Sequence, residues 1–142
     1  MDNYTKSNEV SVVAYTRLSG KEYKALLLDR GDRKITGQAL LNYLCDKFKI
    51  SRIPLIVAQR NRQCRGKRQV YGYYRYSNGK GVSITIYNHT AKTGREVAIK
   101  AFANTLLHEF IHHYDTELLK IQTIHSAGFY KRISDLESKL SK

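Results

Sequence analysis

Two histidines one helical turn apart are the residues of this chain with the clearest chemical potential. His108 and His112 flank Glu109, Phe110 and Ile111, which gives the pattern His-Glu-x-x-His. At about 100° per residue, the two histidines lie only about 40° apart on one face of a helix, so both imidazoles can bind one metal ion. Glu109 projects beside them, where its carboxylate can accept a proton from a water that zinc has made more acidic. The pattern therefore predicts a zinc site that uses water to break a bond.

The third ligand has to come from outside this helix, because a catalytic zinc is held by three protein side chains and leaves its fourth position to water. We favour His125, since twelve residues separate it from His112, enough to finish one helix and begin the next. Asp135 and Glu137, further along the chain, are the carboxylate alternatives. The sequence therefore predicts one zinc ion, with Glu109 as the catalytic base and with His108, His112 and His125 as the ligands.

Other polar residues near the motif have open roles. Asp115 follows His108 by seven residues and returns to within about 20° of it, so it either orients a ligand imidazole through a hydrogen bond or lies exposed. His113 points about 140° away from His108, and we expect it to face solvent or a neighbouring residue rather than the metal. The sequence does not identify the group that stabilises the oxyanion of the reaction; its candidates are Tyr130, His113 and Tyr114.

Helices that can position these residues are predicted from the apolar pattern. Apolar residues recur at helical spacing through residues 94–119, which include the histidine pair, and again through residues 126–140. Another helix is expected from Thr36, as its N-cap, to Ile50. Nearer the start, residues 10–17 and 23–28 favour two strands of a hairpin, although residues 24–29 also suit a helix. We expect residues 1–9 to form a flexible tail.

Strands are predicted in the middle of the chain. Pro54 precedes a short apolar strand at residues 55–58, and strands at residues 70–76 and 82–87 are joined by a turn at Asn78-Gly79. In the second of these, apolar and polar residues alternate, so one face belongs to the core and the other faces something polar. Residues 59–69 are expected to form a loop. The predicted class is α+β, with a central, mostly antiparallel sheet, a long helix that carries the motif and a second, C-terminal helix.

The composition is that of one globular domain spanning residues 1–142. Of these residues 42% are hydrophobic, and the formal net charge is +13. No apolar stretch approaches the roughly 20 residues that a membrane span needs, and the N-terminus lacks the apolar core of a signal peptide, so we expect a cytoplasmic protein with no membrane partner. Cys45 and Cys64 lie in unrelated contexts and are expected to be free thiols.

The positive charge is concentrated in the middle of the chain. Twelve basic residues and no acidic residue lie between Lys47 and Arg95, counting both ends. Such a stretch is typical either of a solvated basic surface or of a surface that binds a polyanion, and the tyrosines interleaved with it favour nucleic acid. The tyrosines at 71, 73, 74 and 76 also suit half-buried strand packing. The candidate nucleic-acid contacts are Arg60, Arg62, Arg65, Lys67, Arg68 and Arg75.

Four segments together resemble the SprT-like zinc metallopeptidases, the group that includes Spartan. They are YGYYRY at residues 71–76, SITIYN at 83–88, NTLLHEFIH at 104–112 and HSAGFYK at 125–131. The resemblance covers the chain from Val70 onward and implies a small zincin-like fold, with the same three histidine ligands and the same glutamate base. Two features depart from the family: Ser126 stands where glycine is usual, and the C-terminal zinc ribbon of many bacterial members is missing.

The expected function is that of a zinc-dependent peptide hydrolase. The resemblance implies substrates that are associated with DNA or crosslinked to it, because some members of the family cleave such proteins when DNA is bound. We expect an extended substrate to pair with the strand near residues 82–88. One alternative is a nucleic-acid-binding module whose zinc is structural or vestigial. The other is a metallopeptidase that cleaves a repressor or another regulatory protein. The oligomeric state is not predicted.

Overall fold

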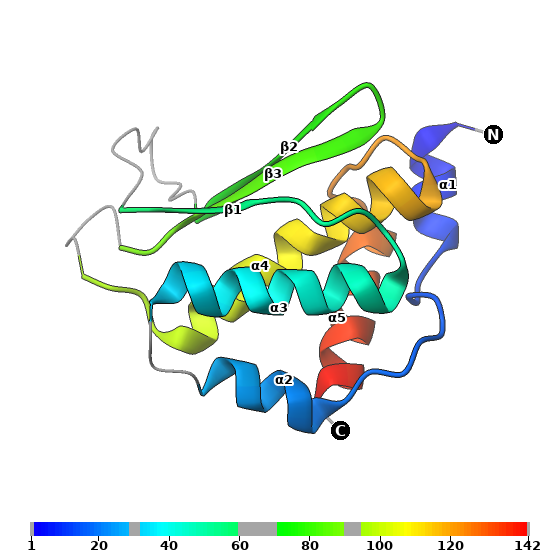
Figure 1. Ribbon diagram of the computed structural model, residues 1–142. Coiled ribbons are helices and arrows are strands. Elements are labelled where there is room, and N and C mark those ends of the chain that lie inside the picture. The colour runs from blue at the N-terminus through cyan, green and yellow to red at the C-terminus, as the bar shows by residue number, and fades with distance from the viewer. Residues whose placement is uncertain (1, 29–31, 60–70, 90–94, 142) are drawn as a thin grey trace.

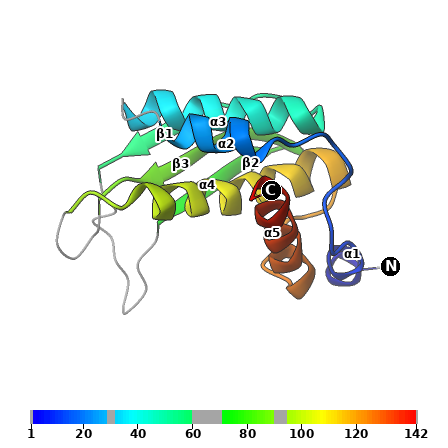
Figure 2. The ribbon, with the colours of Figure 1, turned by 90° about the horizontal axis from the view of Figure 1, so that it is seen from below.

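The chain folds into a three-stranded sheet with helices packed on one side of it (Figures 1 and 2). The computed structural model describes residues 2–28, 32–59, 71–89 and 95–141. In chain order its elements are α1 (Asn3–Glu9), α2 (Gly20–Leu27), α3 (Arg33–Phe48), β1 (Leu55–Ala58), β2 (Gly72–Ser77), β3 (Lys80–Tyr87), α4 (Ile99–Tyr114), a π-helical turn (Asp115–Leu119) and α5 (Ala127–Leu140). The predicted α+β class is confirmed, with a long helix followed by a C-terminal helix.

The sheet has the order β1-β3-β2, so β3 is its central strand. β2 and β3 form the predicted antiparallel hairpin. Asn78 and Gly79 both have positive φ, at 52° and 74°, as the tight turn of such a hairpin requires. β1 joins β3 in parallel. The sheet is therefore mixed, which corrects the prediction of a mostly antiparallel one.

Helices α3 and α4 lie side by side against the same face of the sheet, as the two views show. Leu55, Ile84 and Ile86 point from the sheet into this layer and are fully buried. On the opposite face, called the open face below, Ile56 and Tyr73 of the outer strands are 48% and 42% exposed, whereas Ser83 and Thr85 of the central strand are buried. The long apolar stripe of α4 is thus explained by its position between the sheet and α5.

The N-terminal part of the fold differs from the predictions. The expected hairpin over residues 10–28 is wrong, because residues 20–27 form α2. Ser19 caps this helix and Glu22 lies three residues later, a pairing that favours a helix start over a turn. The expected tail at residues 1–9 is also wrong, since α1 begins at Asn3 with Asp2 as its cap.

The later helices follow the predicted order with shifted ends. α3 is capped by Asp32, whose carboxylate accepts from the backbone N–H of Lys34, and Thr36 lies buried inside the helix rather than at its start. α4 begins at Ile99, later than predicted, and its last turn continues as a π-helix. α5 matches its prediction, because the hydroxyl of Ser126 accepts from the backbone N–H of Phe129.

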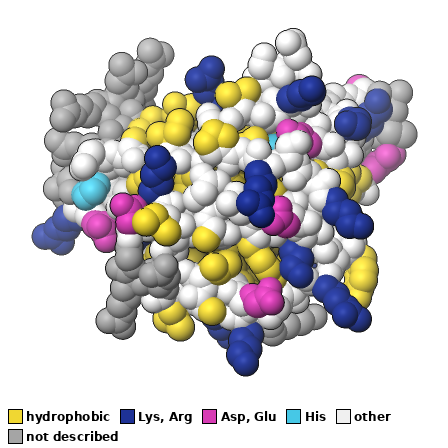
Figure 3. Space-filling model, viewed as in Figure 1, with side chains coloured by type: hydrophobic (Ala, Val, Ile, Leu, Met, Phe, Trp, Pro, Cys, Tyr) yellow, Lys and Arg dark blue, Asp and Glu magenta, His cyan; other side chains and the backbone are white. Residues whose placement is uncertain are grey.

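Lysine and arginine side chains are spread over the face of the molecule seen in Figure 3 rather than gathered over one element. Of the twelve basic residues of the acid-free stretch, six lie within the described residues; they are Lys47, Lys49, Arg52, Arg75, Lys80 and Arg95. In the described part of the chain, no helix has both the length and the apolar composition that crossing a membrane requires.

Cys45 should be nearly inert toward thiol reagents in the folded protein. It is a free thiol with no exposed surface, and burial raises its pKa to about 12, so it stays protonated at pH 8. We expect a Cys64→Ser variant, in which Cys45 is the only thiol, to react with a disulfide reagent about a thousandfold more slowly when folded than in urea. A native rate close to the denatured rate would show that Cys45 is accessible. Cys64 lies outside the described residues.

Candidate metal centre

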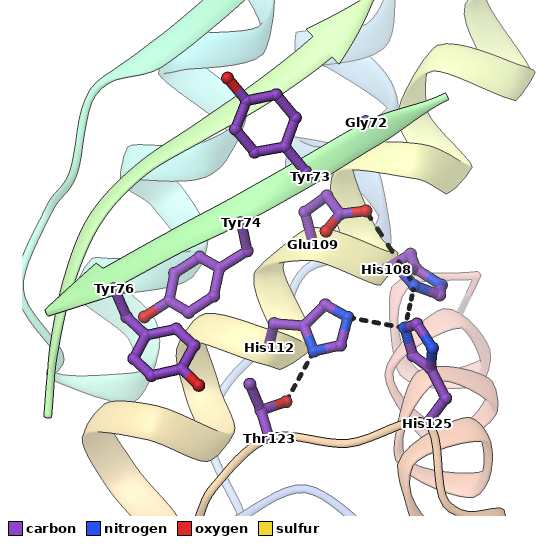
Figure 4. A pocket seen from close by; sticks show the side chains of 9 residues that line it. All are labelled: Gly72, Tyr73, Tyr74, Tyr76, His108, Glu109, His112, Thr123 and His125. Atoms are coloured by element: carbon purple, nitrogen blue, oxygen red, sulfur yellow. Dashed lines mark hydrogen bonds and ion pairs between the residues drawn. The ribbon is translucent and has the colours of Figure 1, made fainter. Parts of the chain in front are cut away.

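Three imidazoles, two from α4 and one from the segment just before α5, converge on one point (Figure 4). The Nε2 atom of His125 lies 3.0 Å from Nε2 of His112 and 3.3 Å from Nε2 of His108. Zinc binds imidazole nitrogen at about 2.0–2.1 Å, so two ligands of a tetrahedral ion stand about 3.3 Å apart. The two distances from His125 are close to this value, and the ligand nitrogens of all three residues lie within 4.8 Å of one another, near enough to share one ion.

The charge state of the histidines also suits metal binding. Burial, followed by the charge of His125, lowers the pKa of His108 to about 4. Burial and then the neighbouring histidines lower the pKa of His112 to about 3. Both imidazoles are therefore neutral at physiological pH and keep a lone pair for a metal ion.

A hydrogen-bond relay fixes which nitrogen of His112 faces the site. The hydroxyl of Thr123 donates to Oδ2 of Asp115 at 3.2 Å, because a carboxylate can only accept. The hydroxyl oxygen of Thr123 lies 2.6 Å from Nδ1 of His112 and accepts from its N–H. The proton of His112 is thereby held on Nδ1, and Nε2 is left free toward the other two histidines. Asp115 thus reaches the imidazole through Thr123 rather than directly.

Removing this relay should weaken metal binding. In Thr123→Ala the imidazole of His112 loses its acceptor, and we expect zinc affinity to fall about 10–100-fold. Thr123→Ser keeps the hydroxyl and should bind zinc nearly as the parent does. Competition titration with a chromophoric chelator measures both constants, and equal affinity of the alanine and parent proteins would show that Thr123 does not orient the ligand.

Asp115 is in turn held by a fully buried arginine from α5. Arg132 donates from Nε and Nη2 to the two carboxylate oxygens, at 3.0 and 2.8 Å. Its remaining N–H groups bond the backbone oxygens of Ser7 and Val10 and the hydroxyl of Ser7. All five donors of the guanidinium are therefore used, as burial of such a charge demands.

Helix α1 packs against the segment that carries Thr123 and His125. Asn3 makes two hydrogen bonds with the backbone of Gln122, at 2.7 and 2.8 Å, and the hydroxyls of Ser7 and Ser126 are 2.6 Å apart. The side chain of Asn8 accepts from the backbone N–H of Gly128. A Cβ at Gly128 would collide with the backbone of Ser7, so glycine is needed for this approach. The N-terminal helix is thus part of the support of the site.

Glu109 lies beside the histidines in a pocket of about 300 Å³. Its side chain is 7% exposed, and Oε2 is 4.0 Å from Nε2 of His108. Burial raises the pKa of this carboxyl group to about 7. Strand β2 passes over it at Gly72, where a Cβ would press against Thr105 and the backbone of Thr85. A buried carboxylate with a pKa near neutrality, next to three ligand nitrogens, can accept and return a proton.

Neither carboxylate alternative for the third ligand belongs to the histidine cluster of the described residues. Asp135 accepts from the backbone N–H of Val13 and pairs with Lys139. Glu137 lies more than two turns beyond the start of α5. Of the ligands considered from the sequence, His125 is the one that the structure places beside the histidine pair.

The candidates for the oxyanion group fall in different places. His113 is fully buried, with Nε2 donating to the backbone oxygen of Ser51 and Nδ1 accepting from Tyr74. Tyr114 is buried and accepts from the backbone N–H of Ala14 on the far side of α4. Tyr130 is half exposed, and its ring centre lies about 6 Å from those of His108 and His125. Tyr130 is therefore the one of the three that borders the histidines.

The residues expected to contact nucleic acid are not brought to the site. Arg60, Arg62, Arg65, Lys67 and Arg68 lie outside the described residues. Arg75 pairs with Ser83 in the hairpin, one position from the inward-facing pair of Tyr74 and Ile84, so it points to the open face of the sheet. It is exposed there, on the side away from α4.

Three of the four segments that resemble the SprT-like peptidases, at residues 71–76, 104–112 and 125–131, contribute to one pocket. β2, α4 and the residues before α5 all line it; the lining residues are Gly72, Tyr73, Tyr74, Tyr76, His108, Glu109, His112, Thr123 and His125. Comparison of the chain with models of known families, with curated proteins and with solved structures gave no match. The family resemblance accordingly stays a prediction from the sequence.

Proposed function

We propose that the protein is a zinc-dependent peptide hydrolase with a zincin-like fold similar to that of the SprT-like peptidases. The observation that carries the proposal is the convergence of three Nε2 atoms with the carboxylate of Glu109 beside them. Three imidazoles suit zinc, which favours nitrogen ligands and needs one open position for hydrolysis. Zinc, when bound, would supply an acidified water and polarise the scissile carbonyl.

Residues of the chain would then have separate roles in catalysis. Glu109 takes the proton from the attacking water and passes it to the leaving amine, for which a pKa of about 7 is well suited. Thr123 and Asp115 hold the ring of His112 in the tautomer that ligates. Phe129 stacks on the same ring, with centres 4.4 Å apart, and keeps it from rotating.

We place the substrate strand of this proposal beside β2 rather than beside β3. The prediction that it pairs near residues 82–88 is wrong, because β3 is already paired on both sides. The backbone N–H of Tyr87 donates to the oxygen of Tyr71, so along β2 the residues paired through hydrogen bonds alternate with unpaired ones. By this alternation Gly72 and Tyr74 direct their N–H and C=O groups to the free edge beside the metal site. An extended peptide could add there as a fourth strand.

Metal analysis of the purified protein tests the proposal. We expect about one zinc per chain for the parent and a large loss of zinc for His125→Ala, because two imidazoles bind the ion much more weakly than three. Hydrolysis of an unfolded protein should stop with a chelator and return with added zinc. A parent protein that contains no zinc, or that cleaves equally well in the chelator, would overturn the proposal. His89→Ala serves as the control and should keep its zinc, because His89 pairs with Glu96 in an isolated β-bridge and does not belong to the histidine cluster.

Proteins bound to DNA are the substrate class that the sequence favours. Support comes from the net charge of +13 and from exposed Arg75 next to the aromatic side chain of Tyr73 on the open sheet face. Cleavage of one protein, free and crosslinked to an oligonucleotide, separates this proposal from its alternatives. Faster cleavage of the crosslinked form supports it, and preference for the free form favours a regulatory protein as substrate. DNA binding that falls with salt, without any cleavage, favours a binding module.

A further inference from the structure

A groove follows the free edge of β2, and among the described residues lysines line only one of its ends. At the Tyr71 end it is lined by Asn104 and Thr105, and its centre is the histidine pocket. Beyond Tyr76, which lines both the centre and the far end, it opens into a pocket of about 600 Å³. Lys80 and Lys120 line this last pocket. The described residues that line the other two pockets include no lysine or arginine, and Glu109 lines both of these pockets.

The backbone at or beside each lysine is fixed by a hydrogen bond, but neither ammonium group has a partner charge among the described residues. Lys120 ends the π-helical turn with φ of 54°, and its N–H donates to the oxygen of Asp115. Lys80 follows the hairpin turn, and the next N–H, of Gly81, donates to Glu117 of the same π-helical turn. No described carboxylate lies within 4 Å of either ammonium group, and no acidic residue lines the pocket.

Glu117, which directly follows the pocket residue Thr116, forms its hydrogen bonds away from the pocket. Its two carboxylate oxygens accept from the backbone N–H groups of Ser51 and Gly81. Its Oε2 is also 3.8 Å from Nδ1 of buried His113. Glu117 therefore joins the hairpin turn to the helix layer, and the two ammonium groups remain the charges that the pocket presents.

We propose that this pocket is a subsite for an acidic side chain of the substrate, so that the protein prefers Glu or Asp on one side of the cleaved bond. This inference rests on the proposed hydrolase function. A peptide paired with Gly72 and Tyr74 would continue past Tyr76 into the pocket, about two to four residues from the metal at roughly 3.3 Å per residue. An ionised carboxylate there would meet two ammonium groups and no opposing carboxylate. At the other end of the groove the described lining residues offer it the side chains of Asn104 and Thr105 and the carboxyl group of Glu109, but no ammonium group.

Peptides that are anchored on the metal test this directly. Two sets of short peptides are used, one with a hydroxamate at the C-terminal end and the other with a hydroxamate at the N-terminal end. The hydroxamate binds zinc, so each set lies on a different side of the metal in a fixed register. In each set a single position carries either Glu or Gln. With the zinc-loaded protein we expect one set to bind about five- to tenfold more tightly with Glu, the effect of two partly solvated ion pairs. In the other set, whose peptides have the same net charges, the affinities of the Glu and Gln peptides should differ by less than about twofold.

Charge variants complete the experiment. Lys80→Gln/Lys120→Gln should abolish the preference for Glu, and Lys80→Glu/Lys120→Glu should replace it by a preference for Lys. Lys21→Gln/Lys34→Gln removes the same charge from exposed positions of α2 and α3 and should leave the preference unchanged. Equal binding of Glu and Gln peptides in both sets overturns the subsite while leaving the hydrolase proposal intact. A protein that binds no zinc overturns both. A last outcome is that the preference for Glu is absent and that Lys80→Gln/Lys120→Gln instead weakens the binding of a short single-stranded oligonucleotide. The pocket then binds phosphate and the proposal fails.

Discussion

Glu109→Gln should bind zinc like the parent protein and lose about 10²–10⁴-fold in hydrolysis rate, the contribution typical of a general base. The amide has nearly the shape of the carboxylate but cannot accept the proton of the attacking water. None of the three ligand nitrogens belongs to this residue, so the metal content should not change. Because burial raises the pKa of Glu109 to about 7, replacing it by a neutral group should stabilise the fold slightly rather than disrupt it.

Zinc content by elemental analysis and hydrolysis of an unfolded protein are the two measurements needed for this variant. Glu96→Gln is the matched control, since its side chain is 56% exposed and pairs with Arg33 away from the pocket. It should retain full activity. Unchanged cleavage by Glu109→Gln would remove the basis of the proposed mechanism, and loss of zinc would show that the residue supports the ligands instead.

Arg132→Ala should destabilise the fold by about 3–5 kcal/mol, because it leaves the buried carboxylate of Asp115 without its partner. The substitution also frees the backbone oxygens of Ser7 and Val10, which hold α1. A helix of seven residues is not stable alone, so α1 should detach when these bonds are lost. The measurement is urea unfolding of the zinc-free protein, which separates folding from metal binding.

The neighbouring residue gives the control for this prediction. Lys131 is exposed on the same helix, and Lys131→Ala should change the free energy of unfolding by less than about 0.5 kcal/mol. The double variant Asp115→Ala/Arg132→Ala should lose less stability than the two single losses added together, since no unpaired charge is left buried. Strictly additive losses would mean that the two side chains do not act as a pair.

The second half of the fold could be predicted because its signals are local. The Asn78-Gly79 turn fixes the hairpin, and Ser126 fixes the start of α5. The spacing of His108 and His112 on α4 follows from helix geometry alone. These features depend on residues a few positions apart, and periodicity and capping chemistry describe them well.

The residues that support the site depend on contacts between distant segments, which a single sequence does not reveal. Thr123 was missed because its hydroxyl matters only once Asp115 and His112 face it across a turn. Arg132 had a visible signal, since it lies between Phe129 and Leu136 at helical spacing in the apolar stripe of α5. A charged residue in such a stripe indicates a buried ion pair. Its partner could not be named without the fold.

The contact between Ser7 and Arg132 also determines when the metal centre can form during synthesis. These residues are 125 positions apart, and the bonds between them join the first helix to the last. A nascent chain cannot make them until α5 has left the ribosome, even though α4 with its histidine pair emerges earlier. We therefore expect newly made chains to acquire zinc late, after translation of α5, so that the centre is assembled only once both α1 and α5 are available to pack together.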